Sequence, residues 1–223
     1  MTAADALVDG SSPIRLPLSR DRIAEAALAR IDAEGLDALS MRKLGTDLGV
    51  EAMSLYNHVR NKDDLLRAVS ELLHDKVLGY YDVESSASWQ DKARVMAYAW
   101  WRVGNEHPNA FTLIADNPVQ GLAGIKVLAE CMNLFTDAGF SLDAAVQAFQ
   151  AAAAWLIGAV TQELGLMRSL AAGEGFSDAE VPDDLRALVD FKRVCTGTDS
   201  EVRFRHGLEI LLAGVEARLA PVL

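Results

Sequence analysis

The stretch ALSMRKLGTDLGVEAMSLYNHV, residues 38–59, decides the fold of the N-terminal third of this chain. Leu44 and Leu48 recur at helical spacing, and Gly49 ends the short helix that they predict. A second short helix is expected over about 51–58, directly after the turn at Gly49. Two short helices joined by a glycine-containing turn, with another helix in front, indicate a helix-turn-helix motif. The second helix of such a motif enters the major groove of DNA.

Apolar residues recur at helical spacing through most of the remaining sequence, and no strand alternation persists. The predicted fold class is therefore all-α, with an N-terminal three-helix helix-turn-helix domain and a larger C-terminal helical domain. The candidate N-caps are Ser19, Ser40, Asn61 and Ser141. The helices expected outside the motif cover about 19–35, 61–79, 89–106, 119–137, 141–170, 183–194 and 201–220, with a shorter piece that ends near 116.

Charge is distributed unevenly along the 223 residues, whose formal net charge is -11. Residues 14–76 hold ten Lys/Arg and eleven Asp/Glu, so this segment is almost neutral. A neutral segment binds a polyanion only if its cations share one face, because bulk charge does not attract the ligand. The expected contacts with DNA are therefore local.

The cysteines and the apolar runs indicate a protein of the cytoplasm. Cys131 and Cys195 lie far apart and outside any CxxC pair, which is typical of two reduced thiols. No secretory signal is visible at the N-terminus. The run from Val146 to Val160 is too short, and too interrupted by glutamine, for a membrane span, so it is interpreted as a buried helix. No membrane partner is expected.

The residues around the motif suit both base reading and phosphate contact. Ala52 and Met53 could contact a thymine methyl group, Arg42 a guanine and Asn57 an adenine. Polar and basic side chains at the flanks are expected to hold phosphates. Alternative roles stay open, since Tyr56 also suits packing between helices and His58, Lys43 and Arg60 suit a solvated surface. The candidate DNA-binding residues are Ser40, Met41, Arg42, Lys43, Ala52, Met53, Ser54, Tyr56, Asn57, His58 and Lys62.

The run IAEAALARIDAEGLDALSMRKLGTDLGVEAMSLYNHVRNKDDLL, residues 23–66, resembles the DNA-binding domain of the TetR family, the tetracycline-repressor-like regulators. The resemblance implies a nine- or ten-helix plan and a homodimeric repressor that a small molecule releases from a palindromic DNA operator. Asn57 departs from the tetracycline repressors, which commonly carry an aromatic residue there. The resemblance implies DNA contacts at Arg42, Ala52, Met53, Ser54, Tyr56, His58 and Lys62. The expected organisation is a flexible tail over 1–18, a DNA-binding domain over 19–79 with its fourth helix as connector, and an effector-binding and dimerisation domain over 80–223.

The runs SWQDKARVMAYAWW and DAGFSLDAAVQAFQAAAAWLIGAV resemble, more weakly, the ligand domain of the tetracycline-repressor subgroup. This resemblance implies that the helices at about 141–170 and 201–220 pair with their copies in a second subunit as a four-helix bundle. The alternative is that the same residues form the interior of a monomer. The candidate dimer-interface residues are Ala148, Ala152, Trp155, Phe204, Leu208, Leu211 and Leu212.

Apolar and aromatic residues of the middle helices suit a ligand pocket, although each one alone also suits core packing. Leu78 stands where the resemblance places a drug-binding histidine, and FTLIADNP offers no second histidine, so magnesium-tetracycline is not the expected effector. The candidate pocket residues are Trp100, Trp101, Phe111, Met132, Phe135, Phe149, Trp155 and Met167.

Enzymatic and metal-dependent functions lack a motif. The four histidines form no HExxH pair, and no phosphate loop or nucleophile elbow occurs, so no catalytic residue, cofactor or metal is expected. Glu71, His74 and Asp75 share one helical face, which is interpreted as solvated rather than as a metal site. A second hypothesis keeps the helical ligand domain and treats the DNA-binding part as vestigial, in a ligand-binding or adaptor protein.

Overall fold

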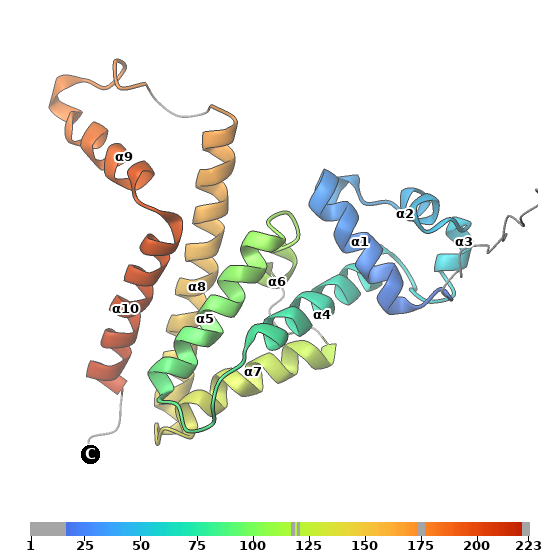
Figure 1. Ribbon diagram of the computed structural model, residues 1–223, viewed down its shortest axis with the longest axis horizontal. Helices are drawn as coiled ribbons and strands as arrows, with labels where there is room; N and C mark the ends of the chain where they lie inside the picture. Colours follow the sequence, from blue (N-terminus) through green and yellow to red (C-terminus); the bar gives the residue numbers. More distant parts are fainter. Residues whose placement is uncertain (1–16, 117–118, 120, 174–176, 220–223) are drawn as a thin grey trace, which may run out of the picture.

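The computed structural model describes residues 17–116, 119, 121–173 and 177–219, which form ten α-helices, two short 3-10 helices and no strand. The predicted all-α class is confirmed (Figure 1). Most of the predicted tail over 1–18 lies outside the described residues. The helices are α1 (Arg20–Glu34), α2 (Met41–Leu48), α3 (Ala52–Leu55), α4 (Lys62–Tyr80), α5 (Trp89–Glu106), α6 (Thr112–Asp116), α7 (Gly121–Thr136), α8 (Leu142–Ala171), α9 (Ala187–Gly197) and α10 (Ser200–Leu219), with 3-10 helices at Leu36–Ala38 and Asp183–Leu185.

Helix starts follow the predicted caps. The side chain of Ser19 accepts the Arg22 N–H at 3.2 Å, and that of Asn61 accepts the Asp64 N–H at 2.8 Å. Ser40 and Ser141 cap α2 and α8 in the same way. Each cap satisfies one N–H that the first helical turn leaves without a partner, so the chain enters the helix at a defined residue.

The head, which comprises α1, α2, α3 and the first turns of α4, is built around one apolar core. Ile23, Ile31, Leu44, Leu55 and Leu65 are fully buried in it. The helix α4 packs against α1 at one end and against α5 and α7 at the other, so it joins the head to the rest of the chain. Figure 1 shows α2 and α3 at the end of the molecule remote from α8 and α10.

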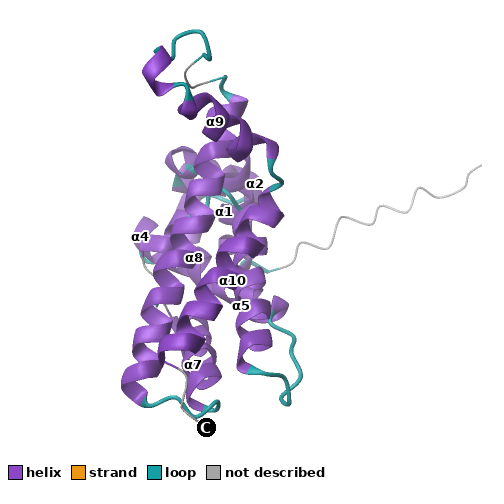
Figure 2. Cartoon of the chain, turned by 90° about the vertical axis from the view of Figure 1, so that its left-hand side faces the viewer, coloured by secondary structure: helices purple, strands orange, loops and turns teal. Residues whose placement is uncertain are grey.

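The body comprises α5 to α10. The long helix α8 packs against α5 and α7, and α10 runs beside α8 and also contacts α5 (Figure 2). The helix α9 stands away from this bundle, at the upper left of Figure 1. The single helix predicted over about 183–194 is instead a 3-10 turn at Asp183–Leu185 followed by α9. The helix α9 ends three residues beyond the predicted end. The body thus presents long apolar helices side by side, with one face of α8 left uncovered.

The prediction that the apolar run at Val146 to Val160 is buried is wrong for the single chain. Only 17% of the most apolar window of α8 is buried, and the helix is long and apolar enough, by length and composition, to cross a membrane. The reason is that α8 packs on α5, α7 and α10 along one side, while Leu142 and Val146 lie on its exposed side. Composition alone does not distinguish these two faces.

Candidate DNA-reading head and effector cavity

Two glycines allow α2 and α3 to meet closely. A Cβ atom on Gly45 would lie 2.9 Å from the Val50 carbonyl oxygen and 3.1 Å from the Ala52 backbone nitrogen, closer than side chains normally pack. Gly49 ends α2 with φ of 65°, in the left-handed region that glycine adopts without strain. The turn geometry of the motif therefore depends on Gly45 and Gly49.

The side chains of the motif divide between core and surface. Leu44, Leu55 and Val59 are buried, while Met53 is 71% exposed on the outer face of α3. Since α3 ends at Leu55, it is shorter than the expected helix over 51–58, and residues 56–58 form a turn. Among the remaining candidate contacts, Met41, Ala52 and Ser54 are half-buried, and Ser40, Arg42, Lys43, Tyr56, Asn57, His58 and Lys62 are exposed.

The cations of the head differ in whether an acid already pairs with them. Lys43 Nζ lies 3.0 Å from a Glu34 carboxylate oxygen. In the part of the chain that the structure describes, no carboxylate lies within ion-pair distance of Arg42 or Lys62. These two exposed cations are available to an outside anion without breaking an internal pair.

A buried carboxylate fixes the chain segment that follows α3. Asp64 is 6% exposed, and one of its oxygens accepts the backbone N–H of Arg60 at 2.9 Å. The guanidinium groups of Arg60 and Arg20 also bond to it. The Arg60 N–H first, and then these charges, hold the pKa of Asp64 well below its ordinary value. The network anchors the turn that carries the exposed Tyr56 and Asn57.

The sequence carries a local signal for this network at the start of α4. Asn61 is an N-cap and Asp64 lies three residues later, which is the spacing of a capping box. The acid of such a box accepts the backbone N–H of the cap residue itself. Asp64 instead accepts that of Arg60, one residue before the cap.

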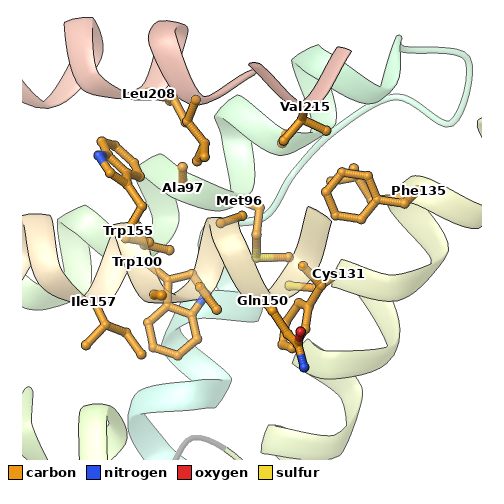
Figure 3. Close-up of a pocket in the computed structure, with 18 of the residues that line it drawn as sticks. Met96, Ala97, Trp100, Cys131, Phe135, Gln150, Trp155, Ile157, Leu208 and Val215 are labelled. Atoms are coloured by element: carbon orange, nitrogen blue, oxygen red, sulfur yellow. The ribbon is translucent and has the colours of Figure 1, made fainter. Parts of the chain in front are cut away.

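The body encloses a cavity of about 390 Å³ between α5, α7, α8 and α10. Figure 3 shows Trp100 and Trp155 at one end of the lining and Phe135 at the other. Gln150 supplies the only side-chain amide, and no charged side chain belongs to the described lining. Burial raises the pKa of the Cys131 thiol, which also lines the cavity, to about 12. The cavity therefore suits an uncharged, largely apolar molecule.

The predicted pocket residues separate into two groups. Trp100, Phe135, Phe149 and Trp155 line the cavity. Phe111 is buried behind Trp100, Trp101 lies beside Phe204 outside the cavity, Met132 packs with the core near Phe135, and Met167 is exposed toward the end of α8.

The sequence interpretation missed Met96, Cys131 and Gln150 as lining residues. Met96 and Cys131 lie four positions before Trp100 and Phe135, so helical spacing from the aromatic residues places them on the same faces. Gln150 had no such signal, because it follows Phe149 directly and is exposed.

The interpretation of Glu71, His74 and Asp75 as one solvated face needs correction. His74 is fully buried, its Nδ1 lies 2.8 Å from the Ser70 carbonyl oxygen, and its ring meets Trp100 edge-on with centroids 5.7 Å apart. The described residues hold no cluster of three metal-ligating side chains. The histidine is thus part of the core between α4 and α5.

Most of the predicted dimer residues contact their own chain. Ala148, Phe204, Leu208 and Leu212 are buried within the protomer, and Ala152, Trp155 and Leu211 line the cavity. The apolar stripe of α10 that contains Phe204, Leu208 and Leu212 faces inward, because α10 packs through it on α5 and α8. The exposed large apolar residues of these two helices lie elsewhere, at Leu142, Val146, Met167 and Leu170 on α8 and at Ile210 on α10.

A helix-turn-helix head with free cations, joined to a helical body with an apolar cavity, defines a ligand-responsive DNA-binding protein. The family model for bacterial regulatory proteins of the tetR family matches residues 23–69, and that for the tetracyclin repressor-like C-terminal domain matches residues 84–219. The chain belongs to the TetR family and is a DNA-binding transcriptional regulator.

Relatives and solved structures agree with this assignment. An HTH-type transcriptional regulator of Saccharopolyspora erythraea is 34% identical over 90% of this chain and 85% of its own length. The class D tetracycline repressor protein of Escherichia coli is 28% identical over 92% of this chain and 93% of its own. ActR of Streptomyces coelicolor in complex with actinorhodin superposes with a TM-score of 0.74 at 29% identity, covering 91% of this chain and 98% of that one.

Proposed function

We propose that this chain is a homodimeric transcriptional repressor, which binds a palindromic DNA operator and releases it when a small uncharged molecule fills the body cavity. One observation carries the proposal: a head with unpaired exposed cations and a body with an apolar cavity occur in the same chain. The complex of ActR with actinorhodin supports a small-molecule effector. On this account the chain acts in the cytoplasm and catalyses no reaction.

In the proposed operator complex, α3 lies in the major groove. The exposed Met53 contacts a thymine methyl group, and Arg42 reads a guanine from the first turn of α2. Lys62 and the exposed Tyr56 hold phosphates on either side of the groove. Asn57 is exposed in the same turn and is an expected contact with adenine or phosphate.

The proposed effector is neutral, because a charged group would lose its hydration without meeting an opposite charge. The aromatic rings of Trp100, Trp155 and Phe135 provide flat apolar walls, and Gln150 offers one amide for a hydroxyl or carbonyl group. Leu78 cannot replace the histidine that binds drug in the tetracycline repressors. Magnesium-tetracycline is therefore not the proposed effector.

The proposed dimer covers the uncovered face of α8 and α10. Leu142 is 68% exposed and Ile210 is 75% exposed, and a second copy that packs on this face would bury both. A Cβ atom on Gly158 or Gly214 would meet nothing within 4 Å, so these positions leave room for close approach of partner helices. Pairing of these faces with a second copy, rather than with lipid, also explains the apolar composition of α8.

Dimerisation supplies the second head that a palindrome requires. A single short recognition helix contacts few base pairs, whereas a twofold dimer reads two half-sites about one DNA turn apart. The near-neutral head then needs only a few well-placed cations in each subunit.

Binding to DNA that flanks the protein's own gene tests the proposal. A gel shift across a range of salt concentrations should show a preferred sequence, and Arg42→Ala should relax that preference while leaving nonspecific affinity. Absence of sequence preference at every salt concentration contradicts the repressor function. If the protein then still binds apolar molecules, it is a ligand-binding or adaptor protein instead.

A further inference from the structure

A direct polar contact joins the head to the body far from the DNA-reading surface. His107 ends α5, and its Nδ1 lies 2.8 Å from Oδ2 of Asp32 in the last turn of α1. Because a carboxylate only accepts hydrogen bonds, Nδ1 is the donor. The side-chain amide of Asn109 also donates to the Asp32 carbonyl oxygen, at 3.1 Å. Two bonds from one turn therefore hold the same end of α1.

This contact leaves one polar atom of each partner without a hydrogen bond. Oδ1 of Asp32 and Nε2 of His107 are buried and have no partner among the residues that the structure describes. Unpaired buried polar atoms are costly, and opening the contact would let water reach both. Opening the contact therefore recovers part of the free energy that is lost when its hydrogen bond breaks.

One side of the contact is coupled to the cavity. Trp100 lines the cavity, and its ring meets that of Phe111 edge-on at 6.4 Å between centroids. Phe111 is 1% exposed, and its backbone N–H donates to the His107 carbonyl oxygen at 2.9 Å. The helix α5 is packed tightly beside this path, because a Cβ atom on Gly104 would lie only 2.4 Å from Val160 and 3.3 Å from the Phe111 ring. A molecule that displaces Trp100 therefore also displaces the turn that carries His107.

The other side of the contact is coupled to the helix-turn-helix. Ile31, directly before Asp32, is fully buried in the head core. Arg30 donates from Nε to an Asp47 oxygen in α2 at 2.6 Å. A shift at the end of α1 is thereby passed to α2 and to the base-reading surface beyond it.

We propose that the contact between Asp32 and His107 is the joint through which occupancy of the cavity changes the position of the DNA-reading head. The inference rests on the proposed function, and it adds the route of regulation. The joint is closed in the operator-binding state and opens when an occupant pushes Trp100 against Phe111. His107 is a positioning residue, because it touches neither DNA nor the occupant.

The test uses the full-length protein, the operator sequence that it prefers in the gel shift, and N-phenyl-1-naphthylamine, a neutral apolar dye whose fluorescence reports binding. The measured quantity is the ratio of operator Kd with and without saturating dye. In the unchanged protein this ratio should be about tenfold or more, within the usual range of allosteric coupling. In His107→Ala it should fall to about 1, while dye Kd and dye-free operator Kd stay within about threefold.

Three further variants make the result specific. Asn105→Ala is the matched control, because the Asn105 amide donates to the Trp101 carbonyl within α5 and does not reach α1. It should keep the full ratio. Asp32→Ala removes the acceptor and should lose the ratio as His107→Ala does, which also covers a failure of the histidine variant to fold. His107→Asn keeps a nitrogen donor near the position of Nδ1 and should restore part of the ratio.

Different outcomes distinguish failure of the joint from failure of the proposed function on which it rests. A full ratio in both His107→Ala and Asp32→Ala overturns the joint and leaves the proposed function standing. Equal loss in Asn105→Ala also overturns it, since any disturbance of the turn would then suffice. Dye that does not bind, or that fills the cavity of the unchanged protein without weakening operator binding, contradicts the proposed function and removes this inference with it.

Discussion

Replacement of Lys62 by alanine should weaken binding to every DNA sequence alike, because this exposed cation is expected to contact a phosphate. Each phosphate contact contributes about 0.9 to the slope of log K against log salt. A twofold dimer loses two such contacts, so the slope should become shallower by about 1.8. At about 0.1 M salt the loss of these two phosphate contacts should weaken the operator complex by roughly 60-fold.

Lys43→Ala is the matched control for this prediction. Its ammonium group lies 3.0 Å from Glu34, so the charge is already paired and fewer counterions should be released when DNA binds. Fluorescence anisotropy with labelled operator, at several concentrations between about 50 and 200 mM salt, gives both slopes. The reasoning is refuted if Lys62→Ala leaves the slope unchanged, or if Lys43→Ala lowers it by as much.

Three other substitutions follow from the structure. Gly45→Ala should destabilise the protein by about 1–3 kcal/mol and abolish operator binding, because the added methyl group meets the backbone at Val50; unchanged thermal unfolding contradicts this. The pKa of Asp64 is lowered on folding, so its contribution to stability is present above about pH 4 and is lost as pH falls further. Asp64→Asn should therefore be less stable than the unchanged protein at pH 7, and its stability should fall less between pH 7 and the acid range below about pH 4. Urea unfolding at several pH values measures this, and parallel profiles of stability against pH for the two proteins would contradict it. Ile210→Glu should yield monomers in sedimentation, whereas a persistent dimer places the interface elsewhere.

Local signals made the helical plan predictable from the sequence. Ser19, Asn61 and Ser141 cap the helices that they were expected to cap, because a short polar side chain before an apolar periodic run satisfies a free N–H wherever the helix packs. The turn at Gly49 was predictable for the same reason, since its left-handed backbone favours glycine. These features depend on a few neighbouring residues only.

The faces of α8 and α10 were not predictable in this way. Helical spacing found the stripe that includes Phe204 and Leu208, and the structure buries it inside the protomer. Both helices also carry apolar residues on another face, at Leu142 and Ile210, which periodicity alone cannot assign to the chain's own core or to a second copy. Distinguishing the two requires the tertiary packing.

Contacts between distant segments lay beyond sequence reasoning. His107 lies at the turn that ends α5, but its bond to Asp32 joins residues 75 positions apart. His107 belongs to no motif, and the motif that contains Asp32 does not indicate a partner in the body. The cavity presents the same difficulty, because Trp100 faces it while the adjacent Trp101 faces away, although both are tryptophans on one helix.

Selection of DNA from a random library by the full-length protein, at near-physiological salt, tests the central claim most directly. A dimer with two reading heads predicts enrichment of one palindrome, whose half-sites are centred about 34–36 Å apart along the DNA. Enrichment should be lost in the dimer-breaking variant Ile210→Glu. Recovery of no common sequence, or of a single half-site with no symmetric mate, would contradict the account of this protein as a dimeric operator-binding repressor.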